Sequence, residues 1–511
     1  MFKSILGDYG HLSYPDDGGF PDFIYDLKLD SVLAPIFRTD SSGTLRRIYL
    51  SPLEDESIIR SRQDVFCDLE DSGLLDFLDS FSRSFMELGS SIGSIRKYLE
   101  EKGISPRKRR IAGRLLHLAE DYIRWVKALD DELDGAALKS QNMIAFSDYV
   151  HGYVDSESFI GLASDSSNLR KCFSDFRYEV HIRKGTIQVF PSEGGESLTE
   201  KVRSLFGDLA DEEEESYLKR LDDSPYSEDV EESIMELLER TYPEKFSKLD
   251  SFFDLHLDFA DRKIMDFSLE LRFYISWISE MKRIEASGLH FCLPDFSDHS
   301  FHADDFFSLS LAEDKGRDTV PSSFRLDGNE RIIVVTGPNQ GGKTTFARAF
   351  GEIHYLASLG LPVPGRSACL RIPDHIFTHF GREEDILSGE GRLEDDVRRL
   401  HGILETASDR SIILINEIFS STTAEDAVEL GLKMLEMIID KGSIAVAVTF
   451  LDELAEAYPE VVSMVSLMSS LEPDARTYHL ERGKPDGRAF ALGMAARYSL
   501  DPETLSRRLQ E

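Results

Sequence analysis

The chain has 511 residues, more than one hydrophobic core usually supports, so we expect two or more domains. Hydrophobic residues make up 41% of it and charged residues 30%, a balance that excludes a globally disordered protein. The formal net charge of −36 excludes a protein whose whole surface binds nucleic acid, so any contact with DNA must be local.

We expect no targeting signal in the N-terminal segment. Residues 1–19 have no apolar core followed by a small-residue cleavage site, and no run of 18 uncharged apolar residues occurs in the chain. We therefore expect a cytoplasmic protein with no membrane partner. The cysteines form no C-x-x-C pair, which is typical of reduced thiols. They are Cys67, Cys172, Cys292 and Cys369.

Residues 1–300 are expected to form a mostly α-helical core and lever region. Apolar side chains recur at three- and four-residue spacing from about Ser57 to Leu169, which indicates amphipathic helices. Aromatic side chains at helical spacing between Tyr242 and Glu285 predict a packed core. The acidic residues 211–215 are interpreted as an exposed helix start or connector. The clearest helical set is Leu74, Leu75, Phe77, Leu78, Phe81 and Phe85.

A small hairpin insertion is predicted near residues 176–190. Apolar and polar residues alternate on both sides of Lys184-Gly185. Arg183 and Lys184 at this turn are the better of two candidate DNA contacts. The other is the basic cluster of residues 107–110 with Arg114, and a solvated surface explains either set equally well.

Residues 301–511 are expected to form an α/β domain. A looser segment rich in Asp, Ser and His follows Pro294 and ends at Pro321. Short apolar runs at 332–335, 412–415 and 444–448 then predict buried strands, with an amphipathic helix after each of the first two. This alternation is typical of a mostly parallel sheet.

A phosphate-binding loop is predicted directly after the first of these strands. Residues 337–344 fit the pattern G-x-x-x-x-G-K-[ST] between a strand and a helix. Backbone amides of such a loop wrap phosphates, Lys343 reaches the β- and γ-phosphates, and Thr344 holds Mg²⁺. We therefore expect ATP and Mg²⁺ as cofactors. The expected binding residues are Gly337, Pro338, Asn339, Gln340, Gly341, Gly342, Lys343, Thr344 and Thr345.

The predicted strand at 412–415 ends in Asn416 and Glu417, the position from which a carboxylate supports Mg²⁺ and the attacking water. The metal site is assigned to Thr344, Asn416 and Glu417. Asn416 brings no charge, so Mg²⁺ should be held less tightly and ATP hydrolysis should be slow. Glu417 is the candidate general base, and Lys343 is the second catalytic candidate.

Several motifs, in order, resemble those of the MutS family of DNA mismatch repair ATPases and its shorter bacterial relatives. Residues 336–345 look like the P-loop of that family, where Pro-Asn after the first glycine is a specific mark. The resemblance is dense over residues 320–500, and it implies an ABC-type P-loop ATPase domain. Weaker similarity at residues 25–30 and 58–64 implies a helical core and lever. The other similar segments are 360–365, 376–389, 416–422 with Asp426, and 449–454.

The resemblance also implies partners. It implies a homodimer in which a signature loop completes the nucleotide site of the other subunit. Ser388 with Gly389 is the candidate loop, and the signature serine is either Ser388 or missing, depending on register. DNA, duplex or branched, is the implied partner of a clamp in the levers, through backbone contacts, together with repair proteins. A mismatch-reading N-terminal domain and a C-terminal nuclease domain are expected to be absent.

Two departures from the family bear on the ATPase cycle. Phe450 replaces the switch histidine, and Thr319 stands where an adenine-stacking aromatic is expected. The leading hypothesis is a MutS-like ATPase that couples nucleotide state to a DNA clamp in repair or recombination. The alternative is a nucleotide-switched protein scaffold with little hydrolysis and no DNA binding. A third hypothesis, a transport-type cassette ATPase, accounts for the sequence of residues 387–389 but not for the helical N-terminal half of the chain.

Overall fold

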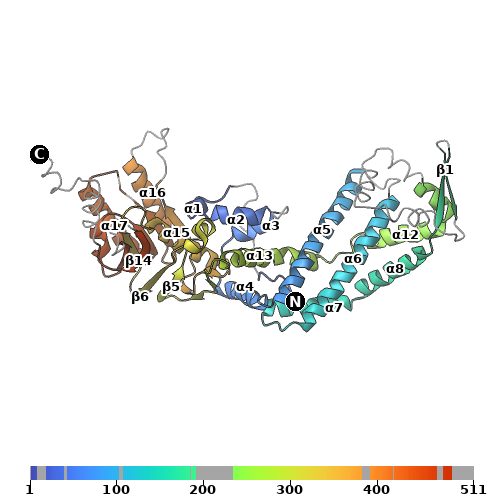
Figure 1. Cartoon of the computed structure of the whole chain (residues 1–511), viewed down its shortest axis with the longest axis horizontal. Coiled ribbons are helices and arrows are strands. Elements are labelled where there is room, and N and C mark those ends of the chain that lie inside the picture. Colours follow the sequence, from blue (N-terminus) through green and yellow to red (C-terminus); the bar gives the residue numbers. More distant parts are fainter. Residues whose placement is uncertain are drawn as a thin grey trace, which may run out of the picture. The chain divides into compact units, whose positions relative to one another are not determined.

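The computed structural model describes residues 2–7, 19–38, 43–102, 108–183, 186–191, 234–381, 392–417, 419, 421–468 and 476–485 (Figure 1). They form two compact units. The first contains Phe2, Ser72–Leu138 and Ile144–Ser268, and the second contains Lys3–Asp71, Lys139–Met143 and the chain from Leu269 on. The acidic residues 211–215 lie outside the described residues. The domain boundary expected at residue 300 stays a prediction, and by packing, residues 3–71 and 269–300 belong to the second unit.

The first unit is built mainly from helices. Helix α6 packs against α5, α8 and α12, and its Tyr122 meets Phe85 of α5 with ring centroids 5.7 Å apart. Both rings are fully buried, so the apolar spacing seen in the sequence does face a core. No helix in the described parts of the chain is both long and apolar enough to span a bilayer. The helices are α5 (Ser72–Lys102), α6 (Lys108–Gly135), α7 (Gln141–Val154), α8 (Glu157–Ser174), α12 (Pro243–His256) and the start of α13 (Arg262–Glu285).

A hairpin is present where the alternating sequence predicts one. Strands β1 (Tyr178–Arg183) and β2 (Thr186–Pro191) pair antiparallel, with Arg183 opposite Thr186. The turn residues Lys184 and Gly185 lie outside the described residues, as does the side chain of Arg183. The DNA-contact hypothesis for this turn therefore stays a prediction.

A six-stranded sheet forms the centre of the second unit, in the order β10-β11-β12-β7-β13-β14. Five strands are parallel, and β14 pairs antiparallel with β13 at the edge. Every residue of β7 and β12 is buried, which explains their continuous apolar sequences. The strands are β7 (Ile332–Thr336), β10 (Ile376–His379), β11 (Ile412–Asn416), β12 (Ile444–Val448), β13 (Val461–Met468) and β14 (Arg476–Arg482).

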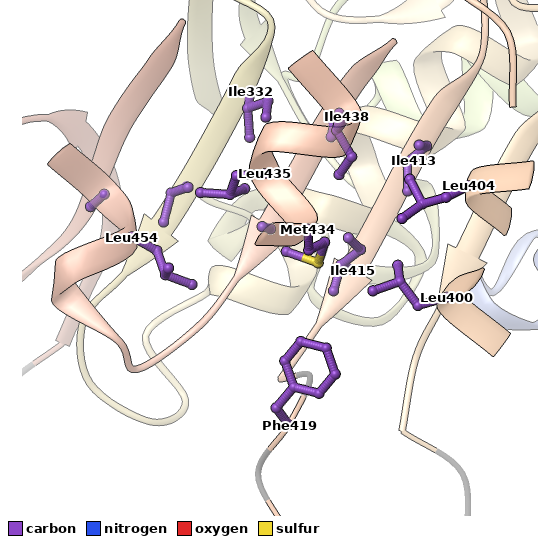
Figure 2. Close-up of a cluster of buried hydrophobic side chains, with 14 of the residues drawn as sticks. Ile332, Leu400, Leu404, Ile413, Ile415, Phe419, Met434, Leu435, Ile438 and Leu454 are labelled. Carbon is purple, nitrogen blue, oxygen red and sulfur yellow. The ribbon is translucent and has the colours of Figure 1, made fainter. Parts of the chain in front are cut away.

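Helices pack on this sheet. Helix α15 (Lys343–Ser358) packs against β11 and β12. Helices α16 (Arg392–Thr406) and α17 (Ala424–Lys441) contribute to a buried cluster around β11. In Figure 2, Leu400 and Leu404 of α16 and Ile438 of α17 lie beside Ile413 and Ile415, and Leu435 of α17 lies toward Ile332. The 3-10 helix η2 (Asp452–Glu456) adds Leu454 to the same cluster. Because α15 packs on β11 and β12, the carboxyl ends of these two strands are held in a fixed position relative to α15.

The segment interpreted from sequence as loose, residues 295–321, has regular structure. Strand β5 alternates buried and partly buried residues and pairs with β6 and β9 in a second, four-stranded sheet. The short helix α14 and the 3-10 helix η1 follow it. The expectation of a loose segment was wrong, because its polar residues alternate with core residues. These elements are β3 (Phe291–Cys292), β4 (Asp295–Phe296), β5 (Ser300–Phe306), α14 (Leu309–Lys315), η1 (Gly316–Asp318), β6 (Ser322–Asp327), β8 (Val363–Pro364) and β9 (Ser367–Leu370).

The N-terminal helices belong to the same unit. Helix α1 (Asp22–Asp26) contacts β10, and the Asp26 side chain accepts a hydrogen bond from Thr378 at 2.6 Å. Arg348 of α15 donates to the backbone oxygen of Asp26 at 2.8 Å. Helix α1 is thus bound to both the sheet and the P-loop helix. The remaining helices are α2 (Leu29–Phe37), α3 (Thr44–Tyr49) and α4 (Glu56–Asp68).

Candidate nucleotide site

The predicted P-loop connects the central strand β7 to helix α15. Gly342 caps the helix with a φ of 93° and Gly337 has a φ of 122°, conformations that side chains other than glycine seldom adopt. The first turn of α15 therefore presents its unpaired amides toward the loop, where an anion is favoured.

Gly341 is enclosed by strand β13. The hydroxyl of Ser466 donates to the backbone oxygen of Gly341 at 2.7 Å. A Cβ atom at residue 341 would clash with this hydroxyl and would lie 3.0 Å from the backbone oxygen of Pro338. Ser466 is buried and was not predicted as part of the site, because nothing in the local sequence of β13 indicates contact with the loop.

Lys343 begins α15 and turns back into the loop. Its Nζ donates to the backbone oxygens of Gly337 at 2.8 Å and Pro338 at 3.0 Å. The side chain is 4% exposed, and burial lowers the pKa of Lys343, an effect that the carboxylate of Glu417 opposes. The same Nζ lies 4.2 Å from the ring centroid of Phe450, so the ring face covers the ammonium.

Phe450 follows β12 in a loop held by backbone contacts. Thr449 donates its amide to Val335 of β7 at 3.1 Å, and the Thr449 hydroxyl accepts from the amide of Leu451 at 3.1 Å. The Phe450 ring is 49% exposed. The residue expected at a family switch position therefore contacts the P-loop lysine directly.

The candidate metal ligands meet at the carboxyl end of β11. The hydroxyl of Thr344 donates to the amide oxygen of Asn416 at 2.8 Å. Glu417 follows in a left-handed conformation, with a φ of 56°, and its backbone amide donates to Val448 at 2.9 Å. The Glu417 side chain is exposed and borders the same cavity as Lys343 and Thr344. Among the described residues, no three His, Cys, Asp or Glu side chains gather as a metal cage.

A cavity of about 430 Å³ extends from the P-loop, a volume within the range of small-molecule sites. One end is lined by residues 339–345 and Glu417. The rest of the lining comes mainly from residues 306–322: the apolar Phe306, Phe307, Leu311 and Val320, and the polar Ser308, Lys315, Asp318 and Ser322. The cavity thus joins an anion-binding end to a more apolar end formed by residues 306–322, which we call the apolar end.

The apolar end was not predicted from the sequence. Thr319, singled out as the replacement of a stacking aromatic, is buried, and its neighbours Asp318 and Val320 line the cavity instead. Of the aromatic residues that line the cavity, Phe306 and Phe307 lie at the end of β5, Phe346 on α15 and Tyr478 on β14. Core residues and cavity-lining residues have the same apolar character, so the sequence alone does not separate them.

Part of the predicted site lies outside the described residues. Ser388 and Gly389, the candidate signature loop, belong to this part, so their role stays a prediction. Of the basic cluster near the start of α6, only the Arg114 side chain is described, and it donates to Ser91 at 3.4 Å. The contact is long for a hydrogen bond, and the Arg114 side chain is exposed.

The region that contains the P-loop and Asn416 is similar to a known protein family. Residues 333–496 match the family model for MutS domain V. This part of the chain is therefore similar to the MutS family. MutS domain V covers all the predicted site residues, whereas the apolar end of the cavity, residues 306–322, precedes it.

Curated relatives carry the names MutS2 and MutS. The Endonuclease MutS2 of Thermus thermophilus is 34% identical over 193 residues, 37% of this chain and 26% of the relative. That of Gemmatimonas aurantiaca is 32% identical over 197 residues, 38% of this chain and 24% of the relative. The DNA mismatch repair protein MutS of Thermotoga maritima is 31% identical over 152 residues, 29% and 19% of the two chains. The chain thus spans about a quarter or less of these relatives.

Proposed function

We propose that this chain is a dimeric, slow ATPase of the MutS kind that couples its nucleotide state to a DNA clamp, in repair or recombination, without reading mismatches. The supporting observation is the cavity at the P-loop of MutS domain V, which joins an anion-binding end to an apolar end. A nucleoside triphosphate has the same two parts, a charged phosphate chain and a flat, weakly polar base. We assign ATP as the nucleotide and the cytoplasm as the location.

The residues present fit a nucleotide with Mg²⁺. The amides of the loop and the Lys343 ammonium would hold the phosphates, and the Thr344 and Asn416 oxygens would hold the metal. With few protein ligands, the remaining metal ligands are phosphate oxygens and water, as is usual for Mg²⁺. When bound, Mg²⁺ neutralises charge that develops on the phosphates. Glu417 would orient the attacking water and accept its proton.

Two features support slow hydrolysis. Asn416 presents a neutral amide oxygen to the metal, so it contributes no charge to metal binding. Phe450 contacts Lys343, whose ammonium must reach the phosphates. Both features also favour the alternative function, a nucleotide-switched scaffold that touches no DNA, and the net charge of −36 favours it further.

Nucleotide binding is tested by titration calorimetry with ADP and with ATP and Mg²⁺. The wild-type chain is expected to bind, and Lys343→Ala to lose binding. Lys433→Ala is the matched control, because Lys433 is an exposed helical lysine paired with Glu436. Equal affinity of the Lys343→Ala variant and the wild type would refute the P-loop assignment.

Dimerisation and DNA binding are tested separately. Sedimentation velocity with and without ATP is expected to show a dimer that ATP tightens, since Ser388 and Gly389 would complete the partner's site. A monomer under both conditions would remove the composite site from the proposal.

The DNA clamp is tested by competition between a matched and a single-mismatch duplex of equal length. We expect binding that falls steeply with salt and shows no preference for the mismatch, because phosphate contacts carry no pairing information. A preference beyond about tenfold would contradict this part of the proposal. Absence of binding to any DNA at low salt, with ATP bound, would favour the scaffold.

A further inference from the structure

Helix α15 carries a carboxylate that the nucleotide-binding motifs do not include. Glu352 lies nine residues after Lys343, and its side chain is fully buried. Its two oxygens accept from the Ser308 hydroxyl at 2.8 Å and from the Leu309 amide at 2.7 Å. Burial raises the pKa of Glu352 to about 7, and these two hydrogen bonds act in the opposite direction. A buried acid without such donors would be strongly destabilising.

One partner of Glu352 lines the cavity, and the other begins the helix that follows. Leu309 is the first residue of α14, and Ser308, which precedes it, lines the cavity. Leu311 and Lys315 of the same helix also line the cavity. Ser308 makes no capping bond within its own helix, so Glu352 supplies an acceptor for an otherwise unpaired amide at the start of α14.

Helix α14 depends on such an external contact. It has seven residues, and helices of this length are unstable unless other parts of the protein hold them. Charged groups near Glu352 lie on both helices, Arg348 on α15 and Glu313 on α14, and they act on its pKa in opposite directions. The two hydrogen bonds of the carboxylate therefore tie the start of α14 to α15, in addition to the packing of α14 on α2.

The two ends of the cavity are thereby attached to one rigid element. Lys343 and Thr344 begin α15, and Glu352 lies on it roughly 13 Å further along the helix axis, at 1.5 Å per residue. We propose that Glu352 is a positioning residue for the base-binding end of the site, which it holds at a fixed distance from the P-loop. This inference rests on the proposed nucleotide binding.

The test compares a ligand with a base, ADP, and one without, inorganic tripolyphosphate, by calorimetry. Glu352→Leu removes both acceptors at similar volume and leaves the Ser308 hydroxyl and Leu309 amide without them. We expect ADP affinity to fall about tenfold, about 1.4 kcal/mol, while tripolyphosphate affinity stays within about twofold. Glu352→Gln should restore ADP affinity, because its amide can accept from Leu309 and donate to Ser308.

Controls separate positioning from general damage. Glu313→Gln removes a carboxylate of α14 that pairs with Arg283, and it should leave both affinities unchanged. If Glu352→Leu does not fold, Ser308→Ala removes one of the two donors and should weaken ADP selectively by a smaller factor. Equal losses for both ligands, or no loss for either, would overturn the inference. A wild-type chain that binds neither ligand would instead overturn the proposed function.

Discussion

Replacement of Phe450 by leucine removes the aromatic face from the P-loop lysine and is expected to tighten nucleotide binding. The ring centroid lies 4.2 Å from Lys343 Nζ. Such a contact contributes about 0.5–1 kcal/mol when exposed and about 2 kcal/mol when desolvated. Here the ring is 49% exposed but the lysine only 4%, so an intermediate value of about 1.4 kcal/mol applies, equivalent to about tenfold in affinity.

The direction of the effect follows from the three donors of the ammonium. Two donate to the backbone oxygens of Gly337 and Pro338, and the Phe450 ring also contacts the ammonium. To reach a phosphate, Nζ must give up at least one of these contacts. The ring contact is the weakest of the three, so it is the one we expect to be lost. Leucine keeps most of the apolar volume and removes only the attraction of the ring.

The measurement is calorimetry with ADP and with tripolyphosphate, which both engage the P-loop. Phe450→Leu should bind each about tenfold more tightly than the wild type. Tyr25→Leu is the matched control, because Tyr25 is 50% exposed in the same unit and does not line the cavity. Unchanged or weaker binding by Phe450→Leu would show that Lys343 keeps the ring contact while it binds phosphate, and the reasoning would be refuted.

Three further changes test other parts of the site. Asn416→Asp should speed ATP turnover, because a charged ligand holds Mg²⁺ more tightly, and a phosphate-release rate at or below the wild-type rate would contradict this. Gly341→Ala should lower stability by about 1–3 kcal/mol through its clash with Ser466, whereas Gly483→Ala, with open space around it, should not, as thermal unfolding would show. The pKa of Glu352 is raised from 4.5 to about 7, so the folded state keeps a proton that the unfolded state releases. As pH rises from 4.5 to 7, the free energy of unfolding of the wild type should therefore fall relative to that of Glu352→Gln. At 1.36 kcal/mol per pKa unit the loss is about 3 kcal/mol. If the urea midpoints of the two proteins differ by the same amount at pH 5 and at pH 8, this prediction is contradicted.

The P-loop end of the site is predictable from the sequence because it is contiguous. A buried strand, a glycine-rich turn and a helix follow one another within residues 332–358, and each has a local signal. Asn416 and Glu417 are predictable for the same reason, since they follow a short apolar run. Carboxyl ends of parallel strands meet at one edge of a sheet, which brings these two residues to the loop.

The apolar end of the cavity is not predictable in this way. Phe307 and Leu311 look like ordinary core residues, and their place beside the cavity depends on how the second sheet packs on α15. Glu352 looks like a charge on the solvent face of an amphipathic helix. That face is covered because strand β5 and helix α14 pack on it, a contact between segments some forty residues apart.

The central position of β7 has a consequence for the order in which the protein is made. Its neighbours in the sheet are β12 and β13, both of which follow it by more than a hundred residues. Ser466, which closes the back of the P-loop, is 130 residues after Thr336. At about 5–20 residues per second, a ribosome needs roughly 6 to 26 s to reach it. During that interval both edges of a strand that is fully buried in the finished sheet lack their partners.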